Sequence, residues 1–462
     1  MRINTNMSAL RSCYQLNKAD SKLAKALERL SSGYKINSAE DNPVGAAIAQ
    51  RLKTQLKGLD RAMQNASDGI SVVETAEGAL TEVTDMVQRM RELAIQGANG
   101  IMSASERQNI MDEVKQLQSE IDRISSSTEF NTRGLINGEL SRRSYTDVVG
   151  THVSHISEEV VAGQYQLNVL KEATYAIFTT DEIDIPNNGI ACSGTITVNG
   201  EGVAIEAGDT RDQVLDKIKS VAELTDISVE YKGTGIEFKS TILGANYPIK
   251  ISCTETLAAT LGMGVEEIAN GENAEVEPVM TGENAFPAST TVEIDGNHIT
   301  LSGSENFEMR FNIDEGMIPA GGSMVTITAL DIGTMVIQMG ANEDQIMDIN
   351  IPEVSCAAMG LDKLNLHTKA GCERAMDMLD DALNYVTQVR SKLGAYTNRM
   401  EYAVKSLTVT NENMTSALSR IEDADMAVEM TDFTSQQVIT QAANSMLAQA
   451  NQLPEKVLQL LQ

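Results

Sequence analysis

The sequence has no Trp, few aromatic residues (4%) and only 8 Pro among 462 residues. This composition suits long helical rods better than a compact enzyme with a deep pocket, and the length predicts three or four domains. No run of 18 apolar residues occurs, so no membrane insertion is expected. The residues after Arg2, Ile-Asn-Thr-Asn-Met-Ser, contain no apolar core and predict no Sec-type signal peptide.

Familiar catalytic and metal-binding motifs are also missing. There is no HExxH, GxSxG, Walker A or CxxC motif. His152-x-x-His155 lies in a strand-like stretch without a third ligand nearby in sequence, and carboxylate pairs such as Glu266-Glu267 have no partner. We therefore predict no catalytic residue, no cofactor and no metal. The cysteines are odd in number and widely spread, which indicates buried or reduced thiols: Cys13, Cys192, Cys253, Cys356 and Cys372.

Basic residues are few relative to acidic ones: 36 Lys and Arg stand against 65 Asp and Glu, which gives a formal net charge of -29. Nucleic acid is therefore not expected as a partner. The imbalance is concentrated in residues 172–360, where 31 Asp and Glu stand against 7 Lys and Arg. Residues 1–60 show the opposite balance, with 10 basic and 5 acidic side chains. The centre is thus expected to be a solvated outer surface and the N-terminal arm something different.

What the sequence does contain is a long helical seam from Val44 to Gln96. Apolar residues recur there at steps of three and four, which predicts a rod of about 75–80 Å that cannot bury its seam alone. Ser103-x-x-Glu106 predicts a capping box for a helix that folds back on it. A second long seam runs from Met376 to Ile421 and is predicted to lie antiparallel to the first.

The centre of the chain has strand-like alternation instead. Residues 190–255 predict a ββαββ unit, with Thr210-x-x-Gln213 capping its helix. A second β-rich block is expected at about 289–351, after an acidic linker at 264–284. The fold class is therefore mostly α at both ends, as an antiparallel long-helix bundle, with an inserted β-rich α+β outer region.

Both ends of the chain predict amphipathic helices, over 8–32 and about 426–452, with Pro454 ending the second. A pair of such helices leaves apolar surface that favours burial against other copies, although packing back onto the central bundle within a monomer is the alternative. The expected subunit-assembly residues are Leu16, Leu23, Leu27, Leu30, Met430, Phe433, Met446, Leu453, Val457, Leu460 and Leu461.

The ends resemble those of bacterial flagellins. Met1-Arg-Ile-Asn-Thr-Asn6, Leu27-Glu-Arg-Leu-Ser-Ser-Gly33 and Gln88-Arg-Met-Arg-Glu-Leu-Ala94 match the N-terminal region. Ser419-Arg-Ile-Glu-Asp-Ala-Asp425 and Met446-Leu-Ala-Gln-Ala-Asn-Gln452 match the C-terminal region. The resemblance covers about 1–140 and 335–462, whereas the middle is only loosely similar.

The resemblance implies a structural, non-enzymatic subunit that polymerises through its terminal helices into the extracellular flagellar filament for swimming motility. It implies an export chaperone, the type III export apparatus, the filament cap and hook-associated proteins as partners. It also implies recognition by Toll-like receptor 5 through Arg89, Leu93 and Glu113, where a surface or inter-subunit ion pair is the simpler reading. A hook–filament junction protein of the same family, or a binding or enzymatic module displayed by the middle region, are the alternatives.

These inferences divide the chain into six parts. Residues 1–42 and 420–462 are expected to be core helix arms that pair with each other. Residues 43–171 and 353–419 are expected to be the two rods of the bundle. Residues 172–285 and 286–352 are expected to form the outer variable domain and a second β-rich segment leading back to the rod.

Overall fold

The structure is a computed structural model that describes residues 6–157, 160–181, 189–232, 235–280, 285–287, 289–304, 307–318, 322–330 and 332–460, with the backbone alone for 453–460. The chain forms two compact units. The first contains Met1–Asp68, Gln338–Met347 and Met400–Gln462, and the second contains Gly69–Ile337 and Asp348–Arg399. Two long helices, α2 (Pro43–Gly97) and α6 (Lys369–Glu422), contribute residues to both units.

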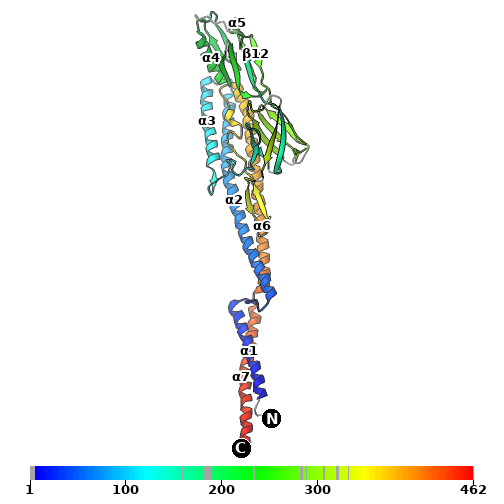
Figure 1. The fold of residues 1–462 in the computed structure, drawn as a ribbon. Helices are drawn as coiled ribbons and strands as arrows, with labels where there is room; N and C mark the ends of the chain where they lie inside the picture. Colours follow the sequence, from blue (N-terminus) through cyan, green and yellow to red (C-terminus); the bar gives the residue numbers. More distant parts are fainter. Residues whose placement is uncertain are drawn as a thin grey trace. The chain divides into compact units, whose positions relative to one another are not determined.

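In the first unit, α1 (Met7–Ser32) and α7 (Met426–Leu460) lie side by side (Figure 1). Gly33 ends α1 in the left-handed conformation, with φ of 75°. Asn42 Oδ1 accepts a hydrogen bond from the Gly45 N–H at 2.9 Å, and α2 begins at Pro43. The predicted helices at the two ends of the chain are confirmed.

Within the same unit, the start of α2 pairs with the end of α6. Asn411 Nδ2 donates to Asp60 Oδ1 at 2.6 Å, and Lys53 forms an ion pair with Glu422. The later residue on α2, Asp60, contacts the earlier residue on α6, Asn411, so the two segments are antiparallel as predicted. Val44 and Ile48, although part of the seam, remain exposed.

The second unit repeats this pairing and adds a third helix. Arg91 Nη2 donates to Asp380 Oδ2 at 3.0 Å, and Arg390 Nε donates to Glu77 Oε1 at 2.9 Å. The fold-back helix α3 (Ala104–Ser127) begins with the expected Ser103–Glu106 capping box. Its apolar face completes a fully buried seam on α2: Val73, Ala76, Leu80, Val83, Val87, Met90 and Ala94.

Two antiparallel four-stranded sheets pack face to face around one apolar core in the second unit. Their inward positions alternate along each strand, as with Leu167 and Val169 on one sheet and Leu301, Met309 and Phe311 on the other. The first sheet has the order β13 (Glu275–Pro278), β5 (Gly163–Lys171), β17 (Ser323–Ala329), β3 (Ser144–Thr146), and the second β14 (Thr291–Asp295), β15 (His298–Ser302), β16 (Glu308–Ile313), β4 (Thr151–Ile156).

The expected ββαββ unit is present as a separate core, with one strand more after its helix than expected. It consists of β7 (Gly194–Val198), β8 (Glu201–Ile205), α4 (Arg211–Leu224), β9 (Ile227–Lys232), β10 (Gly235–Leu243) and β11 (Ile249–Cys253). The Thr210–Gln213 capping box is present. The short helix α5 (Glu255–Leu261) and the strands β6 (Tyr175–Thr179) and β12 (Glu266–Ala269) extend it. Three short pairs or turns complete the elements: β1 (Glu129–Phe130) with β2 (Arg133–Gly134), β18 (Met335–Gln338) with β19 (Ile346–Ile349), and η2 (Leu361–Lys363).

Two features differ from the sequence-based expectations in this region. Strands β3, β4 and β5, within the range expected to belong to the N-terminal rod, pair with strands from 275–329. The expected linker at 264–284 contains β12 and β13, and its residues 281–284 lie outside the described part. Local alternation marks a strand, but the partners of β3, β4, β5 and β13 lie more than 100 residues away and leave no local signal.

The prediction that Pro454 ends the last helix is wrong, because α7 continues to Leu460. Proline has no N–H, so it leaves the carbonyl of Ala450, four residues earlier, without its helical partner. Asn6 Nδ2 donates to that carbonyl at 2.9 Å, while its Oδ1 caps α1 by accepting from the Ala9 N–H at 3.0 Å. One side chain thus satisfies backbone groups of both helices.

This contact predicts energetic coupling between positions 6 and 454. Asn6→Ser keeps the capping oxygen but loses the donor to Ala450, so it should weaken the α1–α7 pairing by about 1 kcal/mol. In a Pro454→Ala background the alanine N–H satisfies the same carbonyl, and the effect should nearly vanish. Amide hydrogen exchange of α1 in the monomer measures both values. Equal losses in the two backgrounds would refute the coupling.

Candidate functional site

The candidate site is the surface of the paired helices α1 and α7. Over the described part, the apolar side chains buried on the two helices are all small, namely Ala19, Ala26 and Ala450, and one charged residue, Glu429, is buried as well. Arg29 Nη1 donates to Glu429 Oε1 at 3.1 Å, across the pair. Small residues let the helices approach closely and leave the larger apolar side chains at the sides and outside.

Two non-helical segments, one between α1 and α2 and one between α6 and α7, join the pair to the long helices, and they lie beside each other. The N–H of Lys35 donates to the Glu422 carbonyl at 2.6 Å, and the N–H of Ala424 donates to the Gly33 carbonyl at 2.9 Å. Asp425 then caps α7 by accepting from the Ala427 N–H at 2.9 Å. Because these two segments satisfy each other's backbone hydrogen-bonding groups, they fix the register in which α1 and α7 begin to pair.

The expected assembly residues divide by exposure. Leu16, Leu23, Leu30 and Phe433 are half-buried. Leu27, Met430 and Met446 are 55%, 50% and 59% exposed. Leu453, Val457 and Leu460 belong to α7, for which the structure describes only the backbone at these positions. Leu461 lies outside the described residues.

Sequence reasoning missed the most exposed apolar side chains of α1. Met7, Leu10 and Tyr14 are 68%, 69% and 66% exposed. They lie three and four residues apart, but Tyr14 is only two residues before Leu16, so they form a second row that the spacing of Leu16, Leu23, Leu27 and Leu30 does not include. On α7, Val438 and Ile439 are exposed as well. Ile439 and Met446 face Arg11 and Gln15 across a shallow groove of about 510 Å³ between the helices.

The residues of the receptor hypothesis lie on α2 and α3. Arg89 Nη2 donates to Glu113 Oε1 at 2.9 Å, and Arg89 Nη1 donates to Glu92 Oε2 at 3.3 Å. The hydrogen bond with Glu113 raises the pKa of Arg89. Leu93 is only 2% exposed, so a partner surface cannot contact all three side chains as expected. The seam that buries Met90 and Ala94 also covers Leu93, because α3 packs on that side of α2.

The weaker chemical candidates do not come together. On β4, His152 lies 3.4 Å from Asp314 and is exposed, whereas His155 is buried against Tyr385. Over the described residues, no three His, Cys, Asp or Glu side chains form a group that could hold a metal. All five cysteines are free; Cys253, Cys356 and Cys372 are buried and Cys13 is exposed. Burial raises the pKa of Cys356 to about 12.

The comparisons with known proteins agree with the ends of the chain. Family models for the bacterial flagellin N-terminal and C-terminal helical regions match residues 3–141 and 376–461. Flagellin B of Vibrio anguillarum is 31% identical over 462 residues, covering 99% of each chain. Polar flagellin C of Vibrio parahaemolyticus is 32% identical over 461 residues, covering 100% of this chain and 99% of the relative.

Solved structures of flagellar proteins also match the chain, with low TM-scores and low sequence identity. FliC from Burkholderia pseudomallei is 18% identical with a TM-score of 0.24, covering 72% of this chain and 99% of that chain. Flagellar hook associated protein-3 from Legionella pneumophila is 12% identical with a TM-score of 0.33, covering 80% and 98%. The family assignment is based on the sequence matches alone.

In the part of the chain that the structure describes, no helix is both long and apolar enough to cross a membrane. The terminal helical regions match the family models, and the relatives match along the whole length at 31–32% identity. The chain therefore belongs to the bacterial flagellin family, whose members form the extracellular filament of the flagellum.

Proposed function

We propose that this chain is the structural subunit of a flagellar filament and that it polymerises by burying the exposed faces of α1 and α7 against other copies. The observation that supports this is the row of Met7, Leu10 and Tyr14 on α1, with Val438 on α7, all more than half exposed. Each such side chain contributes roughly 1.5–3 kcal/mol when it is fully buried. A filament subunit repeats these contacts with several neighbours.

The test is electron microscopy of the purified monomer after it is salted out with short filament seeds. We expect filaments that lengthen from the seeds. A full chain that stays monomeric, with both ends protected from protease, would show that the exposed faces are covered within one molecule and would overturn the proposal.

The partners follow from this role. The cap and hook-associated proteins are expected at the two ends of the filament, and the chain is expected to reach them through the type III export apparatus. The export chaperone would hold the segment from Met426, because Val428, Met430 and Val438 expose apolar surface there. Co-purification of the chaperone with the full chain, and its absence with a chain ending at residue 423, tests this assignment.

We also propose that the helical bundle of the second unit is recognised by Toll-like receptor 5. Arg89 and Glu113 would provide the contact, since both side chains are about half exposed and already lie 2.9 Å apart. Leu93 would act only by packing beneath them.

Arg89→Ala is therefore expected to lower receptor activation at least tenfold, since a charge-assisted hydrogen bond contributes about 1.5–3 kcal/mol. Reporter cells expressing the receptor measure it. Arg123→Ala is the matched control, because Arg123 is also exposed and pairs with Glu120 on α3. Equal activation by the two variants would exclude this epitope.

A further inference from the structure

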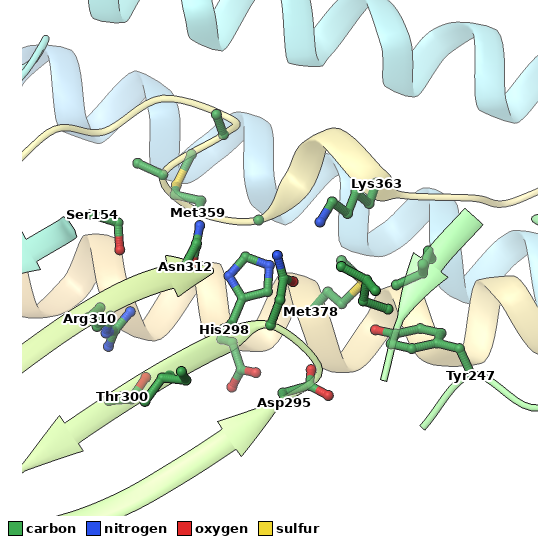
Figure 2. Close-up of a pocket in the computed structure, with 18 residues that line it drawn as sticks. Ser154, Tyr247, Asp295, His298, Thr300, Arg310, Asn312, Met359, Lys363 and Met378 are labelled. Atoms are coloured by element: carbon green, nitrogen blue, oxygen red, sulfur yellow. The ribbon is translucent and has the colours of Figure 1, made fainter. Parts of the chain in front are cut away.

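A polar cavity of about 200 Å³ lies in the second unit, where the sheet of β14, β15 and β16, the end of β10 with Tyr247 after it, the segment that contains η2, and α6 meet. The sheet of β14, β15 and β16 contributes Asp295, His298 and Asn312. The segment that contains η2 contributes Lys363, and α6 contributes Asp381. Figure 2 shows His298 in the middle, with Asn312 and Arg310 on one side of it and Lys363 and Tyr247 on the other. None of these residues belongs to the filament-forming helices.

The lining offers hydrogen-bond donors and acceptors at the same time. Lys363 forms no ion pair with the residues that the structure describes and presents its ammonium as a donor. Burial lowers the pKa of His298, so its imidazole is neutral near pH 7; one ring nitrogen is hydrogen-bonded to the Asn312 side chain, and the other is left for a ligand. Asp295 accepts from Asn246 Nδ2 through one oxygen at 2.7 Å, which leaves its other oxygen as an acceptor.

The charges of the lining balance, although the chain as a whole is strongly acidic. Lys363 and Arg310 carry positive charge, and Asp295 and Asp381 carry the carboxyl groups. Arg310 is held by Glu308 at 2.7 Å and lies over the Tyr385 ring, so it is fixed in place. An ion of either sign gains little from such a lining, because its attraction to one half of the charged groups is offset by repulsion from the other half, whereas a neutral ligand with hydroxyl groups can form hydrogen bonds with both halves.

We propose that this cavity binds a single neutral sugar ring. Hydroxyl groups both donate and accept, which matches the mixture of Lys363, His298, Asn312 and Asp295. The apolar face of a ring fits against the side chains of Met359, Met378 and Tyr247 in the wall. The volume is below the roughly 300–1,000 Å³ of pockets for drug-sized ligands, which limits the ligand to about one ring.

The ring could come from a free monosaccharide or from the end of a longer glycan, because Lys363 is exposed at the rim. Saturation-transfer NMR on the full-length monomer with glucose, galactose, mannose and N-acetylglucosamine tests the free sugars. A glycan array probed with the same monomer tests terminal sugars. Binding in the array alone assigns the ligand to a glycan end, and binding in both experiments supports the cavity equally.

Two variants connect the signal to the cavity. His298→Gln and Asp381→Asn are each expected to weaken sugar binding about tenfold, the loss of roughly one hydrogen bond. His152→Gln is the matched control, because His152 is an exposed histidine on the same sheet and does not line the cavity. Far-UV circular dichroism and the melting temperature confirm that each variant is folded. Absence of binding in both experiments, or equal binding by folded variants and control, would overturn the proposal.

Discussion

A chain truncated to residues 33–423 is expected to form no filaments under conditions in which the full chain lengthens seeds. The truncation removes α1 and α7 and with them the exposed side chains of Met7, Leu10, Tyr14 and Val438. The loss should be complete, because several side chains at roughly 1.5–3 kcal/mol each exceed what a subunit needs to stay in a polymer. Electron microscopy and sedimentation of the seeded sample measure the result.

Point variants separate a lost interface from a damaged fold. Val438→Asp places a charge on an exposed apolar position of α7 and is expected to raise the critical concentration more than tenfold. Gln437→Asp places the same charge on the adjacent exposed polar position and should have a much smaller effect. If the truncated chain polymerises, or if the two variants behave alike, α1 and α7 are not the polymerisation surface.

Acidification from pH 6.5 to 4 is expected to destabilise the packing of β4 on α6 in the second unit. His155 is 9% exposed and meets the Tyr385 ring edge to face, with centroids 6.0 Å apart. Burial, opposed by the charge of Glu308 and assisted by those of Lys392 and Arg310, lowers its pKa to about 4. The imidazole is therefore neutral in the folded protein at pH 7.

The sign follows from the difference between the two states. As the pH falls below about 6.5, the unfolded chain binds a proton at His155 before the folded chain does, so the free energy of unfolding decreases. The decrease should approach about 3 kcal/mol below pH 4. Burial also lowers the pKa of His298 and of His367, so both act in the same direction.

The contribution of His155 is isolated by substitution. His155→Phe keeps a ring against Tyr385 and removes the titration, so hydrogen exchange of β4 amides should lose part of its dependence on pH between 7 and 4. His152→Phe, at the exposed position of the same strand, should keep the full dependence. An unchanged pH profile in His155→Phe would contradict the assignment.

Periodic features were predictable from the sequence, and distant pairings were not. The steps of three and four between Val44 and Gln96 predicted α2, and Ser103 with Glu106 predicted the start of α3. The burial of Leu93 depends on which side of α2 receives α3, which no local pattern states. The burial of His155 depends in the same way on Tyr385, 230 positions later in the chain.

The candidate assembly surface was also only partly predictable. Leu27, Met430 and Met446 followed from helical spacing, whereas Met7, Leu10 and Tyr14 lie on another side of α1 from the predicted row of leucines. The cavity around His298 brings together residues from Tyr247 to Asp381, each unremarkable in its own segment. Its existence depends on the packing of two sheets, a loop and a helix, which sequence periodicity does not encode.

The contact among Asn6, Ala450 and Pro454 has an evolutionary consequence. A proline at 454 is tolerated within a helix here because a donor at the opposite end of the chain satisfies the carbonyl that it exposes. Selection at either position therefore depends on the other. Among flagellins, chains that keep a proline at the equivalent of 454 should keep an amide donor at the equivalent of 6, and chains that lose the proline should be free to vary there.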